Sequence, residues 1–157
     1  MDYTTNYFLL DMLSKFQWDH KFDVVASNEL QTKISGNEDF TLICNLSRRE
    51  EGGSHWISLI RRGDTIYKLD PLLLDFEINP DISSFIASKH VQTKTLRHPI
   101  QHPKSYYCGL FCLYFCLCFN KRVMDICHKF EPFKPMASMK NDCICLDNLS
   151  SIFSAAL

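Results

Sequence analysis

The feature that most constrains the fold is an apolar run of 14 residues, Tyr106 to Phe119, which follows a loop containing two prolines. A helix formed by this run would be apolar on all sides, as is typical of a helix buried in the middle of a core. A helix that crosses a bilayer needs about 20 such residues. We therefore expect a central buried helix from about Tyr106 to Asn120, and no contact with a membrane.

Shorter elements are expected around this helix. Asparagine, proline and aspartate at 79–81 are typical of a helix start, because they combine a cap, a fixed backbone angle and an acid near the positive end of the helix dipole. Apolar periodicity and turn residues predict a helix over 6–16, a short helix opening at 27–30, strands over 40–46 and 91–96, and a short helix leading to Leu157.

Two adjacent strands, His55–Arg62 and Thr65–Pro71, are separated by a Gly-Asp turn. This pattern predicts a β-hairpin, and Pro71 ends its second strand. The two open ends of an antiparallel hairpin lie side by side. We therefore expect His55 and Asp70 to be neighbours in space.

Length and charge narrow the class of protein. The 157 residues fit one domain spanning 1–157, and the net charge of −1 gives no overall signal for nucleic-acid binding. The N-terminal segment MDYTTNYFLLDML lacks the basic region of a secretory signal. The eight cysteines are therefore expected to be free thiols in a reducing, intracellular compartment.

Cys108 differs from the other cysteines of the apolar run by its position. It falls in the first turn of the expected helix, with Ser105 as a candidate cap. Free backbone N–H groups and the helix dipole favour an anion there, and a thiolate is the reactive form of cysteine. Cys112, Cys116 and Cys118 lie deeper in the run, so Cys108 is the candidate nucleophile, although most buried cysteines only pack.

A cysteine nucleophile needs a base that later protonates the leaving amine. His55 is the candidate base, and Asp70 the group that would fix its tautomer and orientation. His98 and His102 are closer to Cys108 in the sequence and are rival bases. Taken singly, each of these residues has an ordinary structural interpretation.

The tetrahedral intermediate also needs donors for its oxyanion. Gln101 precedes Cys108 by seven residues, so its side-chain amide and the Cys108 backbone N–H are candidates for this role. Trp56 follows the candidate base directly and can be a packing residue or part of the site.

The joint pattern of these motifs resembles the adenovirus maturation protease (adenain) family of cysteine endopeptidases, which belongs to a wider clan that includes the SUMO proteases. The matching segments are 49–56, 67–71 and 101–112, and 22–31 also looks like the N-terminal part of the family. The resemblance covers roughly residues 5–120.

The resemblance implies an α+β fold, in which a mixed β-sheet is flanked by helices and the catalytic cysteine begins a central buried helix. It implies a thiol protease with His55 as base, Asp70 as orienting acid, Gln101 as oxyanion donor and Cys108 as nucleophile. It also implies cleavage after Gly-Gly or Gly-x motifs in viral capsid or core precursors during virion maturation. A monomer in the nucleus or cytoplasm of a host cell, and in the virion, is expected.

Two other functions remain open. Asp70 stands where adenoviral enzymes have glutamate, and aspartate is the choice of the SUMO-protease branch. The chain could accordingly be an isopeptidase that acts on ubiquitin or ubiquitin-like proteins. A non-catalytic relative that binds a substrate or capsid partner is the third interpretation, and the complete set of four residues argues against it.

Cofactors are not expected. Adenain is activated by a peptide that forms a disulfide with a cysteine, and His90 stands at that position here. Adenain is also basic and stimulated by DNA, whereas this chain is slightly acidic, so we expect neither a disulfide-linked activator nor strong stimulation by DNA. No metal site is expected either: the helical spacing of Cys112, Cys116 and Cys118, with Cys127-His128 and Cys143-x-Cys145 beyond, fits core thiols better than zinc ligands.

Overall fold

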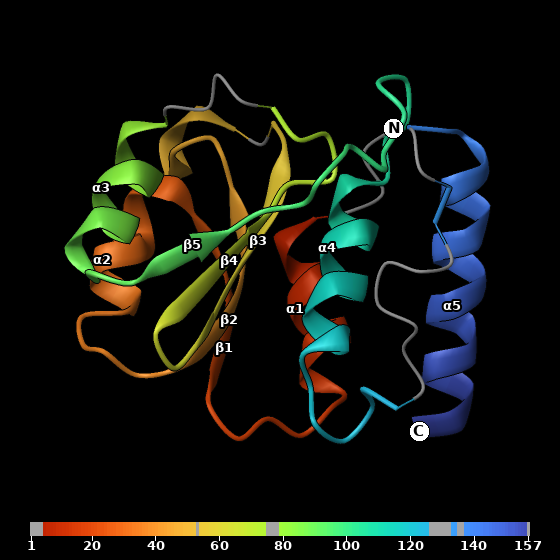
Figure 1. The fold of residues 1–157 in the computed structure, drawn as a ribbon, viewed down its shortest axis with the longest axis horizontal. Helices are drawn as coiled ribbons and strands as arrows, with labels where there is room; N and C mark the ends of the chain where they lie inside the picture. The colour runs from red at the N-terminus through yellow and green to blue at the C-terminus, as the bar shows by residue number, and fades with distance from the viewer. Residues whose placement is uncertain (1–4, 53, 75–78, 126–132, 135–136, 157) are drawn as a thin grey trace.

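The computed structural model describes residues 5–52, 54–74, 79–125, 133–134 and 137–156. Five strands form one sheet in the order β1-β2-β3-β4-β5 (Figure 1). The strands are β1 (Lys21–Ala26), β2 (Phe40–Asn45), β3 (Trp56–Arg62), β4 (Thr65–Leu69) and β5 (Gln92–Lys94). The outer pairs β1/β2 and β4/β5 are parallel, and β2/β3 and β3/β4 are antiparallel. The predicted mixed sheet is confirmed.

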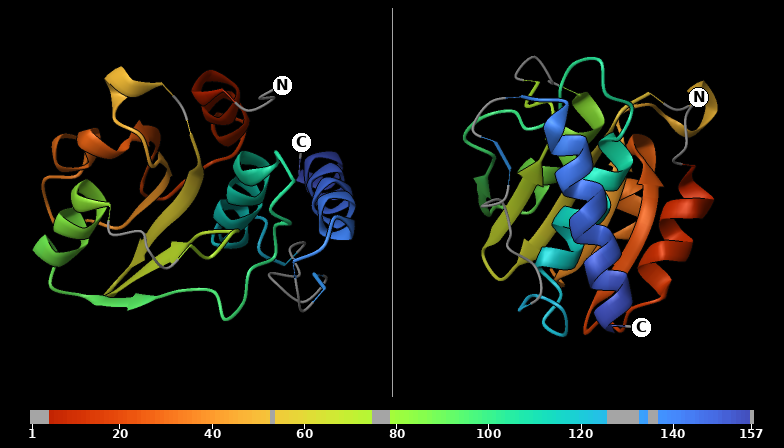
Figure 2. Two further views of the ribbon diagram at one scale, coloured as in Figure 1. Left: turned by 90° about the horizontal axis from the view of Figure 1, so that it is seen from above. Right: turned by 90° about the vertical axis from the view of Figure 1, so that its right-hand side faces the viewer.

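Helices cover both faces of this sheet (Figures 1 and 2). One face carries α1 (Asn6–Ser14) and α4 (Cys108–Cys118), and α5 (Lys140–Ala156) packs against the outer side of α4. The other face carries α2 (Leu30–Lys33) and α3 (Pro80–Ser88). Two short 3₁₀ turns, η1 (Ser27–Glu29) and η2 (Arg49–Glu51), complete the elements. The α+β class with helices flanking the sheet is therefore confirmed.

Successive side chains of β1 and β2 enter two different cores, as the period of a strand requires. On β1, Val24 packs in the core beneath α1 and α4, and Val25 packs in the core beneath α2 and α3. On β2, Ile43 joins the first core and Leu42 joins the second. Both faces of β2 are thus buried, which explains the largely apolar character of this strand.

Helix α4 lies between the sheet and the outer helix α5, so nearly all of its side chains are buried. The buried apolar side chains stabilise this position by roughly 1.5–3 kcal/mol each. The Ser58 hydroxyl on β3 donates a hydrogen bond of 3.1 Å to the Cys112 carbonyl, which joins the helix to the middle of the sheet. The predicted central buried helix is confirmed, and Cys108 is its first residue.

Capping residues in the sequence mark the starts of two other helices. Thr5 caps α1 by accepting a hydrogen bond from the Phe8 N–H. Asn79 caps α3 with its side-chain oxygen, while its side-chain nitrogen donates to the Leu46 carbonyl. The cap and proline expected for this helix are therefore present.

Three expectations need correction. Ser105 is not the cap of α4, because Tyr107 occupies that position without a side-chain cap and the Ser105 hydroxyl donates to Asp142 instead. The strand expected over 91–96 is shorter, since β5 has three residues that pair with β4 alone. The C-terminal helix is longer than expected, since α5 contains the cysteine-rich piece NDCICLD.

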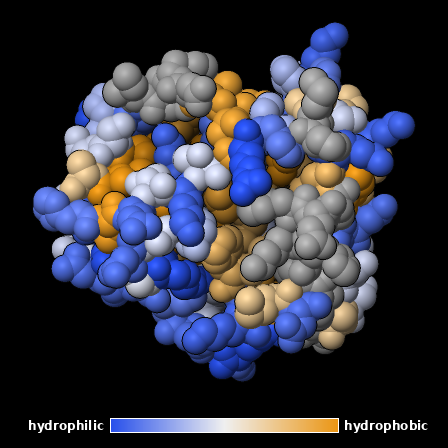
Figure 3. Space-filling model, in the orientation of Figure 1, coloured by the Kyte–Doolittle hydropathy of each residue, from blue (hydrophilic) through white to orange (hydrophobic). Residues whose placement is uncertain are grey.

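Most of the periphery seen in Figure 3 is hydrophilic, and hydrophobic surface gathers toward the middle of that face. Exposed large apolar side chains in the described ranges include Tyr7, 80% exposed at the start of α1, and Tyr106, 70% exposed two residues before α4. Among the helices described, none has the length and apolar character that crossing a membrane requires.

Candidate active site

Asp70 is held in place by the turn that follows β4. Its Oδ1 accepts a hydrogen bond from the Leu72 N–H at 2.9 Å, and its Oδ2 accepts one from the Leu74 N–H at 3.2 Å. Aspartate commonly bonds backbone groups of its own turn in this way. The carboxylate is only 4% exposed, so its orientation toward β3 is fixed by buried contacts.

His55 immediately precedes β3, and its ring lies against this carboxylate. The distance from His55 Nε2 to Asp70 Oδ1 is 2.6 Å. The predicted proximity of the two residues is confirmed. Because Nε2 is engaged by Asp70, Nδ1 is the ring nitrogen left to serve a nucleophile.

The charged form of His55 is stabilised at this position. Burial of the ring favours its neutral form and lowers the pKa, but the hydrogen bond to Asp70 and the interaction with the Cys108 side chain outweigh burial. The resulting pKa of His55 is about 9, well above the usual value of 6.5. A protonated ring is the form that can give a proton to a leaving amine.

Cys108 begins α4 at the end of the helix where backbone N–H groups are free. No side chain in the described part of the protein caps this end. The thiol is 8% exposed, whereas Cys112, one helical turn deeper, is fully buried. The structure thus brings Cys108, His55 and Asp70 together, as the sequence predicted.

Gln101 lies in the loop that connects β5 with α4. The Pro71 carbonyl accepts hydrogen bonds from the Ile100 and Gln101 backbone N–H groups, which places this loop beside Asp70. The Gln101 Nε2 donates to the Ser105 carbonyl at 2.9 Å. Its Oε1 is buried without a hydrogen-bond partner among the described residues. One N–H of the Gln101 amide is therefore used to orient the side chain.

The same loop is anchored to α5 through two residues that sequence reasoning missed. Asp142 Oδ1 accepts a hydrogen bond of 2.9 Å from the Ser105 hydroxyl, which in turn accepts one from the Tyr107 N–H. Asn141 Nδ2 donates to the Ile100 carbonyl at 2.9 Å. Burial raises the pKa of Asp142, and the Ser105 hydrogen bond opposes that rise. Adjacent Asn and Asp residues at a helix start were the only signal in the sequence.

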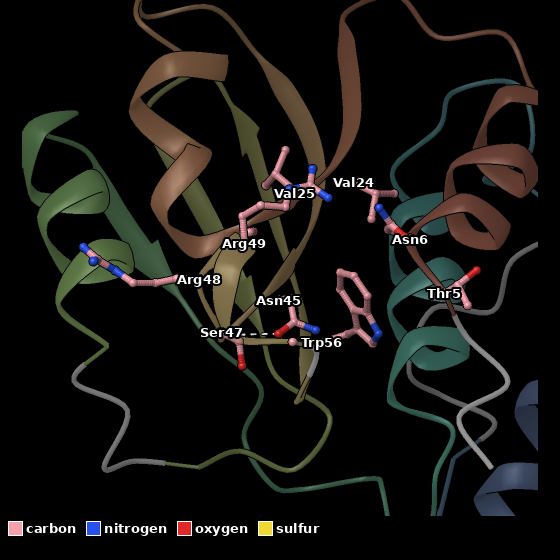
Figure 4. Close-up of a pocket in the computed structure, with 11 residues that line it drawn as sticks. Thr5, Asn6, Val24, Val25, Asn45, Ser47, Arg48, Arg49 and Trp56 are labelled. Atoms are coloured by element: carbon pink, nitrogen blue, oxygen red, sulfur yellow. Dashed lines mark hydrogen bonds between the residues drawn. The ribbon is translucent and has the colours of Figure 1, made fainter.

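A cavity of about 250 Å³ opens beside Trp56, the residue that follows His55 (Figure 4). Its walls come from the start of α1, the carboxyl ends of β1 and β2, and the segment after β2. The lining residues are Thr5, Asn6, Val24, Val25, Ala26, Asn45, Ser47, Arg48, Arg49, Gly52 and Trp56. Trp56 is 6% exposed and forms one wall, so it contributes to a surface beside the candidate base.

The rival histidines have other surroundings. His102 accepts a hydrogen bond from the Lys104 N–H through its Nδ1. His98 is exposed. His55 is the histidine that both Asp70 and Cys108 affect, which favours it as the base. His90, at the position that the resemblance assigns to a linking cysteine, is exposed and adopts a left-handed backbone with φ of 52°.

The remaining cysteines have the environment of core residues. Burial raises the pKa of Cys112 well above its usual value and that of Cys116 to about 12. The seven cysteines in the described ranges are free thiols. No group of three or more potential ligands among the described residues is arranged to hold a metal ion. Cys127 and His128, and Gly53 of the Gly-Gly motif, lie outside those residues.

No model of a known protein family matches this chain, and no curated protein sequence matches it. The resemblance carried by the three motifs therefore stays a prediction.

Proposed function

We propose that this protein is a cysteine endopeptidase of the adenain type that cleaves after glycine-containing motifs and processes viral structural precursors. The observation that carries the proposal is the 2.6 Å hydrogen bond between His55 and Asp70, next to a cysteine at a helix start. Each residue alone is ordinary, but together they supply a nucleophile, a base and an orienting acid.

In the proposed reaction, the Cys108 thiolate attacks the carbonyl carbon of the scissile peptide bond. A C–S bond forms, and the π electrons of the carbonyl move to its oxygen. The Gln101 amide and the Cys108 backbone N–H would donate hydrogen bonds to this oxyanion, and such donors are typically worth about 2.7–4 kcal/mol each.

Collapse of the intermediate breaks the C–N bond, and the leaving amine takes the proton of the His55 imidazolium. A water molecule then gives a proton to neutral His55 and attacks the thioester, which releases the acid and restores the thiolate. Asp70 keeps the ring oriented throughout, with Nε2 toward its own carboxylate.

The surroundings of Cys108 support a preference for small residues. Cys108 is only 8% exposed, and Trp56 beside His55 and Gln101 in the loop before α4 are buried as well. Glycine is the residue that brings a carbonyl closest to such a thiol without a steric conflict. Tyr106, 70% exposed beside the site, offers an aromatic surface to the substrate chain.

A direct test uses two electrophilic probes: a short peptide that ends in Gly-Gly, and ubiquitin carrying the same reactive group. Labelling of wild type, but not of Cys108→Ala, by the peptide probe supports the endopeptidase. Preferential labelling by the ubiquitin probe would favour an isopeptidase instead. A wild-type protein that reacts with neither probe would refute catalysis by this site.

A further inference from the structure

Asn45 is a buried polar residue with a fixed orientation. It ends β2, pairs with Trp56 across the sheet, and is 5% exposed. Its Oδ1 accepts hydrogen bonds from the Ser47 N–H at 2.9 Å, the Ser54 N–H at 3.2 Å and the Ser54 hydroxyl at 3.4 Å. Three donors converge on this atom, so it must be the oxygen of the amide and the nitrogen must point the opposite way.

The amide nitrogen faces the cavity beside Trp56. Figure 4 shows the oxygen of Asn45 turned toward Ser47 and its nitrogen turned toward Trp56. No hydrogen bond joins Nδ2 to a described residue, although Asn45 lines the cavity. The nitrogen therefore points to the cavity while the oxygen holds the amide in place. A donor held this way is prepared for an acceptor that enters from outside.

The position of Asn45 relates this donor to the candidate catalytic site. The Leu46 N–H donates to the His55 carbonyl at 2.9 Å, so the residue after Asn45 is bound to the candidate base. Trp56 follows His55 in the chain, pairs with Asn45 across the strands and contributes to the cavity wall. A peptide whose carbonyl reaches Cys108 and continues past Trp56 would enter the cavity with the residues before the scissile bond.

Charge in the cavity wall indicates what kind of acceptor fits. Arg48 forms an ion pair with Asp81, and Arg49 forms one with Glu29. These arginines are already neutralised, so the cavity does not require an anion. A neutral carbonyl oxygen matches a fixed N–H donor between apolar walls such as Val24 and Trp56.

We propose that Asn45 binds the substrate main chain, its Nδ2 donating to a backbone carbonyl of an extended segment that precedes the scissile bond. This inference rests on the proposed function and adds a substrate-binding residue to it. Because a main-chain carbonyl is common to all residues, Asn45 selects an extended backbone rather than a particular side chain.

The test compares a long substrate with a short one. Asn45→Asp keeps the side-chain size and an oxygen that accepts from Ser47 and Ser54, but removes the donor. We expect kcat/KM to fall at least tenfold, or about 1.4 kcal/mol, for a peptide with four or more residues before the cut. A peptide with Gly-Gly alone before the cut should lose less than twofold. Asn45→Ser should show the same dependence on length without an added charge.

Asn148→Asp is the matched control, because Asn148 lies on α5 and bonds the Ile144 carbonyl away from the cavity. It should cleave both peptides as wild type does. Equal losses on long and short peptides in both Asn45 variants would overturn the inference and indicate a structural role. Unchanged cleavage of both peptides would overturn it as well.

These failures are distinct from failure of the proposed function. If the Gly-Gly probe labels Cys108 of wild type, but the loss of kcat/KM in the Asn45 variants does not depend on substrate length, only the proposed role of Asn45 is refuted. If the probe labels neither wild type nor variants, the proposed function and the inference both fall.

Discussion

The His55 imidazole and the Asp70 carboxylate are joined by a hydrogen bond of 2.6 Å that spans the open end of the β3–β4 hairpin. Backbone donors from Leu72 and Leu74 hold the carboxylate on its other sides. The hairpin therefore orients the ring before any substrate arrives, and the preparation of the base is built into the local structure.

Replacing the nucleophile should stop cleavage. Cys108→Ala removes the sulfur that would form the thioester, so peptide hydrolysis should fall to background in a fluorescence-quenched peptide assay. Cys112→Ala is the control, because that thiol is fully buried. It should retain most activity with lower thermal stability, since a small core cavity remains. Turnover by Cys108→Ala would refute the assignment.

The base should be His55 rather than its rivals. His55→Ala is expected to reduce kcat by orders of magnitude, because no other group can move the proton between the thiol and the leaving amine. Asp70→Asn should be milder, as it disturbs orientation and stabilisation of the imidazolium. Steady-state kinetics of His98→Ala and His102→Ala provide the comparison. If either variant lost as much kcat as His55→Ala, the choice of His55 as base would be contradicted.

The pH dependence follows from the raised pKa of His55, which is about 9 against a usual 6.5. A raised pKa means that folding favours the protonated ring. This contribution to stability is complete below pH 6.5 and is lost as pH rises through about 9. The alkaline limb of kcat/KM should therefore lie near pH 9, and Asp70→Asn should move it to lower pH. If Asp70→Asn leaves the alkaline limb at the same pH, the result would contradict the coupling of His55 to Asp70.

Specificity should be strict at the residue before the cut. Replacing that glycine by alanine should reduce kcat/KM at least tenfold, about 1.4 kcal/mol of transition-state stabilisation. A library of quenched peptides measures this directly, with alanine substitutions after the cut as the control. Equal acceptance of bulky residues would indicate a more open site and a more general protease.

The hydrogen bonds from α5 to the Gln101 loop predict a role for Asp142. Asp142→Ala leaves the Ser105 hydroxyl without its acceptor, so the Gln101 loop should loosen and kcat should fall more than KM changes. Asp142→Asn keeps an acceptor and should recover most of the loss. Asp147→Ala, an exposed change on the same helix, is the control. A rise in KM at constant kcat would instead indicate a role in binding.

Local signals in the sequence were sufficient for the hairpin and for the caps of α1 and α3, because each depends on residues close to one another in the chain. Strand β1 was not anticipated. Its segment KFDVVA mixes charged and apolar residues, and its parallel pairing with β2 joins Phe22 to Thr41 across a long connection. Such a pairing leaves no local turn signal.

The same physical limit explains what was missed at the site. Asp142 acts through Ser105, thirty-seven residues earlier, and Asn45 is fixed by donors from a loop that the sequence does not place. Helix α5 is longer than expected, although it contains several weak helix formers such as Asp, Asn, Ser and Cys. Its buried residues Cys145, Leu149 and Ile152 recur at helical spacing against the core, and this packing outweighs propensity.

The attachment of the Gln101 loop to α5 also has a consequence for the timing of activity. Translation delivers His55, Asp70, Gln101 and Cys108 before Asn141 and Asp142, the two residues that fasten the loop. A partly synthesised chain therefore holds every proposed reacting group but not the support for the Gln101 loop. Under the proposed function, we expect hydrolysis to begin only after α5 has been synthesised and packed, which would protect the growing chain from premature cleavage.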